Sequence, residues 1–583
     1  MKTAFVSTAA TGILAIASLA ADADPRVASW FTGGASRYAR IYTDAAARTA
    51  GSSVTTWSNG SQTQAKPAYA GVQAVYSSAD WVYLRTTGLG QHVMGPWQVG
   101  FPNLPANQHA FYRIPRNPVS PASKTLTGGG PIGYFVDGVA MFDSRDAFYW
   151  NGTTDTQGTG NWNRDAYVNE GATFDPALAH QQNTGTYHYH ANPIALRHLL
   201  GDHVAFDNAN RSYAEAAGPA THHSPILGWV RDGWPVYGPY GYASASNATG
   251  GIRRMVPGYV PRDGKNGTDN LAATGRNSLP AWATRLYGTV GSQTGPAVSG
   301  NFPLGRYMED NAYLGDLGKT IGSDFDLDEQ NGRWCVTPEF PDGVYAYFVA
   351  IDANGTPVFP YNIGRAFHGS PTGTDVSAIS ETVATHFLGG TNRPVVLGTP
   401  VRGAADSVVL TWTAVEGGTY TVERSSDLGA WQPIATGIAA VADGGTATVA
   451  TVSNPALFHV GLTAVAAHDA VDAATGNTGG GGGGGMTGPV LASVAPTAGN
   501  RGTTVTLTLT LGANPPPADL QPKSAKLGAI VGTNLSRNGS QITARFAIPA
   551  GATPGAATPS VTFGGPPGMG DVTFSLANGF TIL

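Results

Sequence analysis

One ten-residue phrase occurs twice in the chain, and it restricts the surrounding sequence to paired strands. Residues 133–142 read GYFVDGVAMF, and residues 228–237 read GWVRDGWPVY. Each phrase is an apolar run, an Asp-Gly pair and a second apolar run. Asp-Gly pairs tolerate the positive φ angles of the tight turns that join antiparallel strands. We therefore predict two similar β-hairpins and an internal duplication, with a fainter third copy around Asn354-Gly355.

The composition agrees with short strands and turns rather than with amphipathic helices. Only 12% of the 583 residues are charged, and 79 are glycine. The hydrophobic share of 42% is enough to build a core, so wholesale disorder is excluded. We expect an all-β multidomain protein: a large, irregular β-rich N-terminal domain followed by two small β-sandwiches. The net charge of −5 argues against a nucleic-acid-binding protein, which needs a basic face.

The N-terminus predicts export. A short positive start at Lys2 precedes an apolar stretch from Ala4 to Leu19, and small residues follow in a cleavage-like pattern. Residues 1–23 are therefore predicted to be a signal peptide. We expect a secreted protein, either extracellular or on the cell surface, with the periplasm as an alternative. No later segment has the roughly 20 apolar residues of a membrane span.

Further boundaries come from a run of seven glycines, Gly479–Gly485. We place a β-rich domain at residues 24–390, a small sandwich at 393–467, a glycine-rich linker at 468–487 and a second sandwich at 488–583. Residues 408–412 and 419–425 form the expected strands of the first sandwich, with Trp412 in its core. This module resembles a fibronectin type III domain. The second, which opens at residues 494–503, resembles the immunoglobulin-like IPT/TIG modules of surface proteins, and such resemblances imply spacing or adhesion.

The segment Tyr187-His188-Tyr189-His190 carries the strongest chemical signal. In a strand, alternate side chains point to the same face, so His188 and His190 share one face and the two tyrosines share the other. Two imidazoles placed in this way can bind one metal ion together. The alternative is a pair of hydrogen-bonded histidines in a polar groove.

Several residues can complete such a site. His222-His223 directly precedes the second hairpin phrase, while His180, His198 and His203 flank the first pair. We expect one histidine of the His222-His223 pair to join His188 and His190 and bind copper or zinc, with copper favoured. Additional ligands or supporting residues are expected among the two tyrosines and the acids at the hairpin tips; these are Tyr187, Tyr189, Asp137 and Asp232. For Asp232, a pure turn role is favoured.

The same tetrapeptide resembles the signature of the YHYH domain family of exported bacterial proteins. The resemblance extends over about residues 70–369, and it includes the motifs at 228–240, 327–333, 337–348 and 360–364. It implies a domain extent and export. It implies no particular reaction.

Acidic residues support two other readings. Asp324, Asp326 and Asp328 resemble the start of a calcium loop, but Glu329 stands where an EF-hand needs glycine, so only an irregular calcium site remains. Alternatively, Asp328 and Glu339 are the paired acids of a carbohydrate-processing enzyme.

Whether the protein is an enzyme stays open at this point. A metal-dependent oxidoreductase or hydrolase is one hypothesis, and a non-enzymatic surface or adhesion protein with a structural YHYH segment is the other. The sequence lacks the Gly-x-Ser-x-Gly and His-Glu-x-x-His motifs, and its single cysteine excludes thiolate clusters. The expected partner is an extracellular ligand or substrate, such as a polysaccharide or a surface component.

The glycine run generates the first testable prediction. Limited digestion with a protease of broad specificity should cut near Gly479–Gly485, because consecutive glycines offer no side chains for packing. The products, identified by mass spectrometry, should include a folded fragment that starts near residue 488. Loss of bound metal from the larger fragment would contradict the independence of the two parts.

Overall fold

The computed structural model describes residues 24–583 apart from short stretches at 60–61, 98–102, 289–290, 404–406, 427–428, 441–443, 451–456, 472–490, 512–520, 564–571 and 577–578. The predicted signal peptide and most of the predicted linker, including Gly479–Gly485, lie outside the described residues. The chain divides into two compact units, Met1–Gly483 and Gly484–Leu583. The predicted sandwich at 393–467 therefore groups with the large N-terminal domain.

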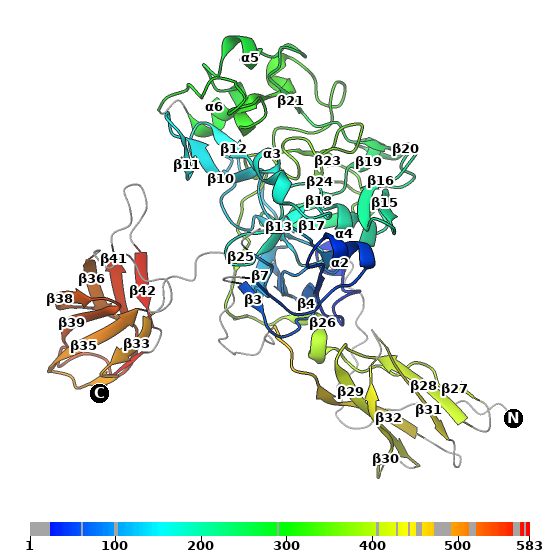
Figure 1. The fold of residues 1–583 in the computed structure, drawn as a ribbon, viewed down its shortest axis with the longest axis vertical. Helices are drawn as coiled ribbons and strands as arrows, with labels where there is room; N and C mark the ends of the chain where they lie inside the picture. The colour runs from blue at the N-terminus through cyan, green and yellow to red at the C-terminus, as the bar shows by residue number, and fades with distance from the viewer. Residues whose placement is uncertain are drawn as a thin grey trace. The chain divides into compact units, whose positions relative to one another are not determined.

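The prediction of an all-β multidomain protein is confirmed (Figure 1). Helices are few and short: α1 (Pro25–Ala28), α2 (Ala45–Ala50), α3 (Ala166–Glu170), α4 (Ile194–Leu199), α5 (Leu271–Thr274) and α6 (Ala281–Tyr287). In the part of the chain that the structure describes, none of them is long and apolar enough to cross a membrane.

The centre of the large unit is an eight-stranded sheet in the order β13-β14-β9-β8-β17-β18-β24-β23. Its strands are β8 (Gly133–Phe135), β9 (Ala140–Met141), β13 (Ala179–Gln181), β14 (Tyr187–Tyr189), β17 (Ile226–Val230), β18 (Pro235–Tyr237), β23 (Gly332–Cys335) and β24 (Val344–Phe348). The two hairpin phrases form β8–β9 and β17–β18, as predicted. Gly138 and Gly233 adopt the positive φ that the Asp-Gly turns require.

The sheet repeats one topology twice. In each half a hairpin is joined in parallel by the last strand of a second hairpin: β14 pairs with β9, and β24 pairs with β18. The halves meet where β8 and β17 pair antiparallel, with Tyr134 opposite Trp229. The predicted duplication is thus visible in the strand order. The fainter copy at Asn354-Gly355 forms a tight turn closed by a single antiparallel bridge between Ile351 and Pro357, without the regular strands of the other two copies.

The strand registers align the two halves residue by residue. Tyr189 lies beside Met141 in the first half, and Tyr347 lies beside Val236 in the second, where Met141 and Val236 hold the same place in the two phrases. The segment 187–190 therefore corresponds to 345–348, which reads Tyr-Ala-Tyr-Phe. The cross-strand pairing continues this match: His180 lies opposite His188, as Arg333 lies opposite Ala346.

A turn built on a buried aspartate precedes the outer hairpin of each half. Asp175 accepts hydrogen bonds from the backbone N–H groups of Ala177 and Ala179, and from the Tyr187 hydroxyl at 2.8 Å. In the second half Asp328 accepts the equivalent bonds from Gln330, Gly332 and Tyr345. The same polar framework thus supports both outer hairpins.

A five-stranded sheet, in the order β25-β7-β5-β4-β26, contributes to the same core. Its strands are β4 (Val72–Ser77), β5 (Trp81–Thr86), β7 (Ala110–Pro115), β25 (Thr374–Asp375) and β26 (Ala384–Leu388). Val72, Leu84 and Ile114 from this sheet share one hydrophobic cluster with Phe135 and Trp229 from the central hairpins. Burial of this cluster is the main source of stability in the large unit.

Other strands of the large unit form separate two-stranded sheets. They are β1 (Arg40–Ile41) with β6 (Val93–Met94), β2 (Trp57–Asn59) with β3 (Gln62–Gln64), β15 (Val204–Asp207) with β16 (Ser212–Glu215), β19 (Tyr240–Ser244) with β20 (Asn247–Arg254), and β21 (Tyr259–Pro261) with β22 (Asn311–Tyr313). A three-stranded sheet contains β10 (Arg145–Trp150), β11 (Asp155–Gln157) and β12 (Asn163–Asp165).

The two smaller modules are sandwich-like. Residues 401–465 form sheets β27-β28-β31 and β30-β29-β32, around a core that contains Trp412, as predicted. The strands are β27 (Val401–Arg402), β28 (Ser407–Thr413), β29 (Gly418–Ser425), β30 (Gln432–Ala439), β31 (Gly444–Ala450) and β32 (Leu457–Val465).

The C-terminal unit has its own core around Leu507, Ile542 and Phe563. Its sheets are β33-β35-β39-β38, β34-β43-β40 and β37-β36-β41-β42. The strands are β33 (Leu491–Ala495), β34 (Ala498–Gly499), β35 (Thr504–Leu511), β36 (Pro522–Leu527), β37 (Ile530–Val531), β38 (Thr533–Asn538), β39 (Gln541–Ala547), β40 (Gly555–Ala557), β41 (Pro559–Phe563), β42 (Val572–Ser575) and β43 (Phe580–Ile582).

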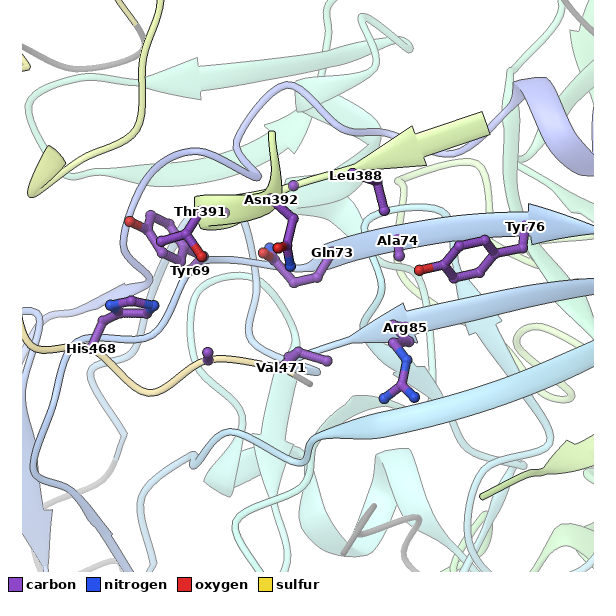
Figure 2. A pocket seen from close by; sticks show the side chains of 13 residues that line it. Tyr69, Gln73, Ala74, Tyr76, Arg85, Leu388, Thr391, Asn392, His468 and Val471 are labelled. Atoms are coloured by element: carbon purple, nitrogen blue, oxygen red, sulfur yellow. The ribbon is translucent and has the colours of Figure 1, made fainter. Parts of the chain in front are cut away.

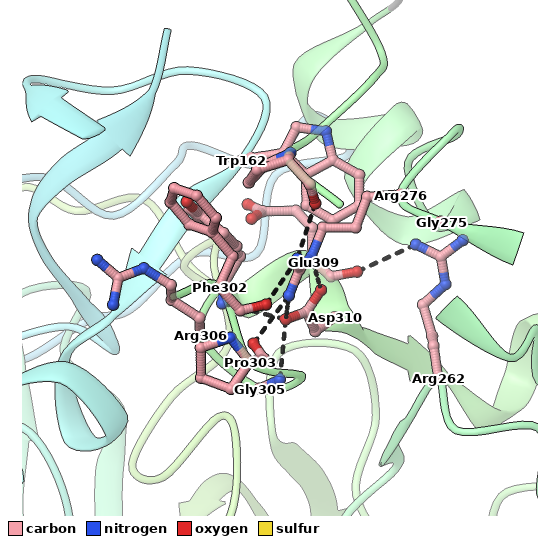
Figure 3. A network of polar contacts seen from close by, with 12 residues as sticks. Trp162, Arg262, Gly275, Arg276, Phe302, Pro303, Gly305, Arg306, Glu309 and Asp310 are labelled. Atoms are coloured by element: carbon pink, nitrogen blue, oxygen red, sulfur yellow. Dashed lines mark hydrogen bonds and ion pairs between the residues drawn. The ribbon is translucent and has the colours of Figure 1, made fainter. Parts of the chain in front are cut away.

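A buried ion pair stabilises the segment of the chain that contains α5 and α6. Figure 3 shows the Arg276 guanidinium facing the Asp310 carboxylate, with N–O distances of 2.6 and 2.7 Å. Arg276 also donates to the carbonyl oxygens of Pro296 and Pro303, and Asp310 accepts from the Gly305 backbone. Both charges are therefore fully partnered in the interior.

Removal of one partner should destabilise this region strongly. Arg276→Met leaves the Asp310 charge buried without its ion pair, and we expect a loss of about 3–5 kcal/mol. The control is Arg285→Met, because the half-exposed Arg285 pairs with Asp316 and Glu329 near the surface, where each pair should contribute at most about 1 kcal/mol. Thermal unfolding of both variants measures the difference; equal melting temperatures would contradict the assignment.

Candidate metal centre

Three histidines converge where the β13–β14 hairpin meets the end of the first hairpin phrase. His180 on β13 lies directly opposite His188 on β14, and His190 follows two residues later on the same face. The Nε2 atoms of His180 and His188 are 3.1 Å apart, and those of His188 and His190 are 3.0 Å apart. The prediction that His188 and His190 share one face is confirmed.

The hydrogen-bond partners of His188 and His190 define their tautomers. His188 Nδ1 lies 2.8 Å from the carbonyl oxygen of Thr186, and His190 Nδ1 lies 2.7 Å from that of Asp143. A carbonyl oxygen can only accept, so each ring carries its proton on Nδ1. Each Nε2 atom is then left with a lone pair.

His180 is held in the same tautomer by a hydroxyl group. Its Nδ1 atom lies 2.7 Å from Thr173 Oγ1, and that hydroxyl donates its own proton to the Glu170 carbonyl oxygen at 2.6 Å. Thr173 Oγ1 therefore accepts the proton of His180 Nδ1. The Nε2 atom of His180 also presents a lone pair to the other two histidines.

Three lone pairs that face each other at this spacing repel unless a cation lies between them. Protonation does not relieve the repulsion near neutral pH, because burial lowers the pKa of His180 to about 3 and lowers those of His188 and His190 as well. Neutral imidazoles with Nδ1 bound to an oxygen acceptor are the usual state of metal-binding histidines. These three side chains can hold a metal ion.

A carboxylate lies beside two of the three histidines, outside the group whose donor atoms are all within 4.8 Å of one another. Glu170, the last residue of α3, places Oε2 at 3.3 Å from His190 Nε2 and 3.6 Å from His180 Nε2. This oxygen is covered and accepts no hydrogen bond, and burial raises the pKa of Glu170 to about 7. The four donor atoms thus form a ring with edges of 3.0–3.6 Å.

The rings of Phe142 and Phe174 pack against the three histidines. Phe142 stacks on His188 with ring centroids 3.8 Å apart, and Phe174 lies edge-on to His180 and parallel to His190. Helix α3, which carries Glu170, begins at the N-cap Asp165, whose carboxylate accepts the Val168 N–H. Apolar walls keep water from the imidazoles and strengthen the interaction with a bound cation.

The pair His222-His223 is not part of this cluster, and the expectation that it supplies the third histidine is corrected here to His180. His223 Nδ1 donates to the Ser224 carbonyl oxygen at 2.7 Å, and the ring packs against Tyr237 and Tyr242 in the second half of the sheet. His222 is exposed and contacts the Gly201 carbonyl. The pair was expected at the site because it directly precedes the second hairpin phrase. That phrase forms the half of the sheet that lacks the histidine cluster.

The two tyrosines occupy the other face of β14, as predicted. Their rings contact each other with centroids 5.8 Å apart inside the hydrophobic core. The Tyr187 hydroxyl donates to Asp175 and lies 3.0 Å from His92 Nε2. Both tyrosines therefore support the strand from behind, on the face opposite the metal cluster.

The aspartates of the hairpin tips act as turn residues. Asp232 accepts hydrogen bonds from the Trp234 and Gly369 backbone N–H groups and from the Tyr347 hydroxyl. Asp137 accepts the Val139 N–H, and burial raises its pKa to about 7. Neither residue joins the group of possible metal ligands.

The acidic candidates are engaged elsewhere. Asp326 binds the Arg253 guanidinium through both oxygens, Asp328 accepts the backbone bonds of its own turn, and Asp324 accepts the Thr320 N–H. These three form no metal-ligand group among the described residues, which corrects the expected calcium site. Glu339 accepts the Tyr237 hydroxyl, whereas Asp328 accepts the Tyr345 hydroxyl, so the two suggested catalytic acids have separate partners.

Glu170 and Thr173 were missed by the sequence analysis. No motif marks them, because α3 and the turn after it reach the histidines only through tertiary packing. The corresponding place in the second half of the sheet carries no such donors: Arg333, Ala346 and Phe348 stand where His180, His188 and His190 stand. There the Arg333 guanidinium packs over the Phe348 ring.

A separate pocket lies beside β4 and β5. Figure 2 shows Tyr69, Gln73, Arg85, Asn392 and His468 around it. The described residues that line it include one histidine and no carboxylate, so it lacks a set of metal ligands. None of the predicted site residues lies there.

Comparisons with known proteins bear on the family. Residues 111–359 match the model of a family described as YHYH protein, which supports the predicted resemblance. No curated protein matches the chain. The solved structures that are similar include a chimeric titin Z1Z2 functionalized with a KLER exogenous peptide from decorin, at 13% identity over 32% of this chain and 95% of that chain, with a TM-score of 0.11. A titin A168169 structure covers 30% of this chain and 91% of its own, at 13% identity and a TM-score of 0.10.

The role of the Thr173 hydroxyl in orienting His180 can be tested directly. Thr173→Val keeps the shape of the side chain but removes the acceptor of the Nδ1 proton. We expect the affinity for Cu(II) or Zn(II), measured by competition with a chelator, to fall about 10–100-fold. Thr184→Val, in the turn between β13 and β14, is the control and should bind normally; equal affinity of both variants would contradict the role of Thr173.

Proposed function

We propose that this chain is an exported protein whose YHYH region binds one transition-metal ion through His180, His188, His190 and Glu170. The observation that carries the proposal is the convergence of three buried Nε2 atoms within 4.8 Å of one another, on rings whose Nδ1 atoms are each held by an oxygen. The carboxylate of Glu170 supplies the fourth donor and lowers the net charge of the bound cation.

The donor set of three imidazoles and one carboxylate suits copper or zinc, and we favour copper because it binds nitrogen ligands more tightly. For ligands about 2.0–2.1 Å from an ion, neighbouring donors lie about 2.9 Å apart in a square plane and about 3.4 Å apart in a tetrahedron. The Nε2 atoms of His180, His188 and His190 have neighbouring distances of 3.1 and 3.0 Å, between these two values, and Glu170 would join them after a movement of its side chain toward the ion.

The proposed role of the ion is functional rather than structural. The second half of the sheet builds the same strands, the same Asp turn and the same tyrosine contacts around Arg333, Ala346 and Phe348. The framework therefore needs no metal to form. An ion at such a site supplies redox chemistry as copper or an activated water as zinc, which makes a metal-dependent oxidoreductase or hydrolase the leading class.

The environment of the protein is part of the proposal. The signal-like residues 1–23 and the YHYH resemblance support export to the extracellular space, the cell surface or the periplasm. We assign the modules at 393–467 and 488–583 to the fibronectin type III and IPT/TIG kinds, as spacers or adhesion modules. The alternative, a surface protein with a structural YHYH segment, predicts that no metal is bound.

The test is metal content and stability measured on the same preparations. Protein purified from medium or periplasm without chelator should hold close to one ion per chain. His190→Ala should lose most of it, and Glu170→Gln should bind at least about tenfold more weakly. The melting temperature of metal-free His190→Ala should stay near that of the metal-free parent, because the large core folds without metal.

His223→Ala is the matched control, since His223 is a buried histidine of the other half of the sheet. It should keep the full metal content. If His190→Ala keeps its metal while the parent contains it, His190 is not a ligand. A parent without metal, even after exposure to Cu(II) and Zn(II), would favour the surface-protein alternative.

A further inference from the structure

We propose that the surface around Trp334 is a carbohydrate-binding site. Trp334 lies on β23, the edge strand at the opposite end of the eight-stranded sheet from β13. This inference does not depend on the metal centre, which belongs to the other half of the sheet.

The exposure of Trp334 is unusual for its position. Its side chain is 59% exposed, whereas Gln181, the residue at the same register position in the first half, is 1% exposed. Among the large hydrophobic residues that the structure describes as exposed, it is the sole tryptophan. A flat aromatic surface held open to solvent is what a sugar ring needs for stacking through its C–H groups.

Three neighbouring rings fix the orientation of the indole. The ring centroids of Trp234, Tyr345 and His368 lie 5.4, 6.0 and 6.1 Å from that of Trp334, and the planes meet at 71–77°. Tyr345 and His368 are stacked on each other with centroids 3.4 Å apart. The indole is therefore packed on one side and presented in one orientation, which reduces the entropic cost of binding a ligand.

Polar groups beside the indole lack partners. Both ring nitrogens of His368 are buried and form no hydrogen bond, and the residue as a whole is 9% exposed. Trp234 Nε1 is likewise buried without a partner. These atoms are covered and are not themselves contacts for a ligand, but they place hydrogen-bonding groups directly beneath the aromatic residues that support Trp334.

The positive charge of Lys124, beside the aromatic residues, favours a neutral or acidic sugar over a cationic ligand. Lys124 Nζ donates to the His368 carbonyl oxygen at 2.6 Å, so an ammonium group stands next to the aromatic cluster. This charge opposes a cationic ligand and can bind the hydroxyl or carboxylate oxygens of a polysaccharide. An apolar stacking face flanked by hydrogen-bonding groups is the chemistry of a sugar ring.

Affinity electrophoresis of the full chain tests the proposal, with gels that contain hydroxyethylcellulose, laminarin or alginate. The parent should be retarded by at least one of the three, and Trp334→Ala should be retarded at least tenfold less at equal polysaccharide concentration. Trp334→Phe should recover part of the retardation, because a smaller aromatic face remains. Phe148→Ala, which removes a partly exposed aromatic ring elsewhere, is the matched control and should behave as the parent.

Trp334→Ala should keep its metal content and its melting temperature, since the side chain is mostly exposed. Retardation by laminarin or hydroxyethylcellulose would identify a neutral sugar, and retardation by alginate alone would identify an acidic one that uses Lys124. The proposal is overturned if no gel retards the parent, or if Trp334→Ala is retarded as strongly as the parent.

Discussion

The antiparallel pairing of β8 with β17 is the contact on which the rest of the large unit depends. Tyr134 and Trp229 lie opposite each other there, and each strand continues through an Asp-Gly turn into its own half of the sheet. Because the pairing joins two similar hairpins, it creates an eight-stranded sheet with two equivalent ends. The histidine cluster lies at the β13–β14 end of the sheet, and Trp334 lies on β23 at the other end.

Because the two ends are equivalent, the residues that both share can be distinguished from those that differ between them. Buried aspartates, the tyrosines that bind them and the strand registers are common to both halves. The side chains on the other face differ: histidines in one half, and arginine with phenylalanine in the other. A shared backbone therefore carries a cluster of neutral donors at one end and a fixed positive charge, in contact with an aromatic ring, at the other.

Local patterns predicted what depends on local geometry. The Asp-Gly phrases predicted both central hairpins, and strand alternation predicted that His188 and His190 share a face. The cross-strand partner His180 required the register of the β13–β14 hairpin, and Glu170 required the packing of α3, so neither followed from sequence spacing. Histidines and aspartates are common metal ligands, so the sequence also pointed to His222-His223 and to the aspartates at 324–328. In the structure His223 packs against Tyr237, Asp326 binds Arg253, and Asp328 accepts bonds from its own turn.

The C-terminal end of α3 reaches the histidine cluster by two routes. Glu170 presents its carboxylate to His180 and His190, while its backbone carbonyl accepts the Thr173 hydroxyl that fixes the tautomer of His180. One residue thus governs both a ligand and the proton position of another ligand. A displacement of this short helix would withdraw the carboxylate and release the tautomer of His180 in the same movement, so uptake and release of the proposed metal ion would be a single cooperative event rather than the stepwise loss of individual ligands.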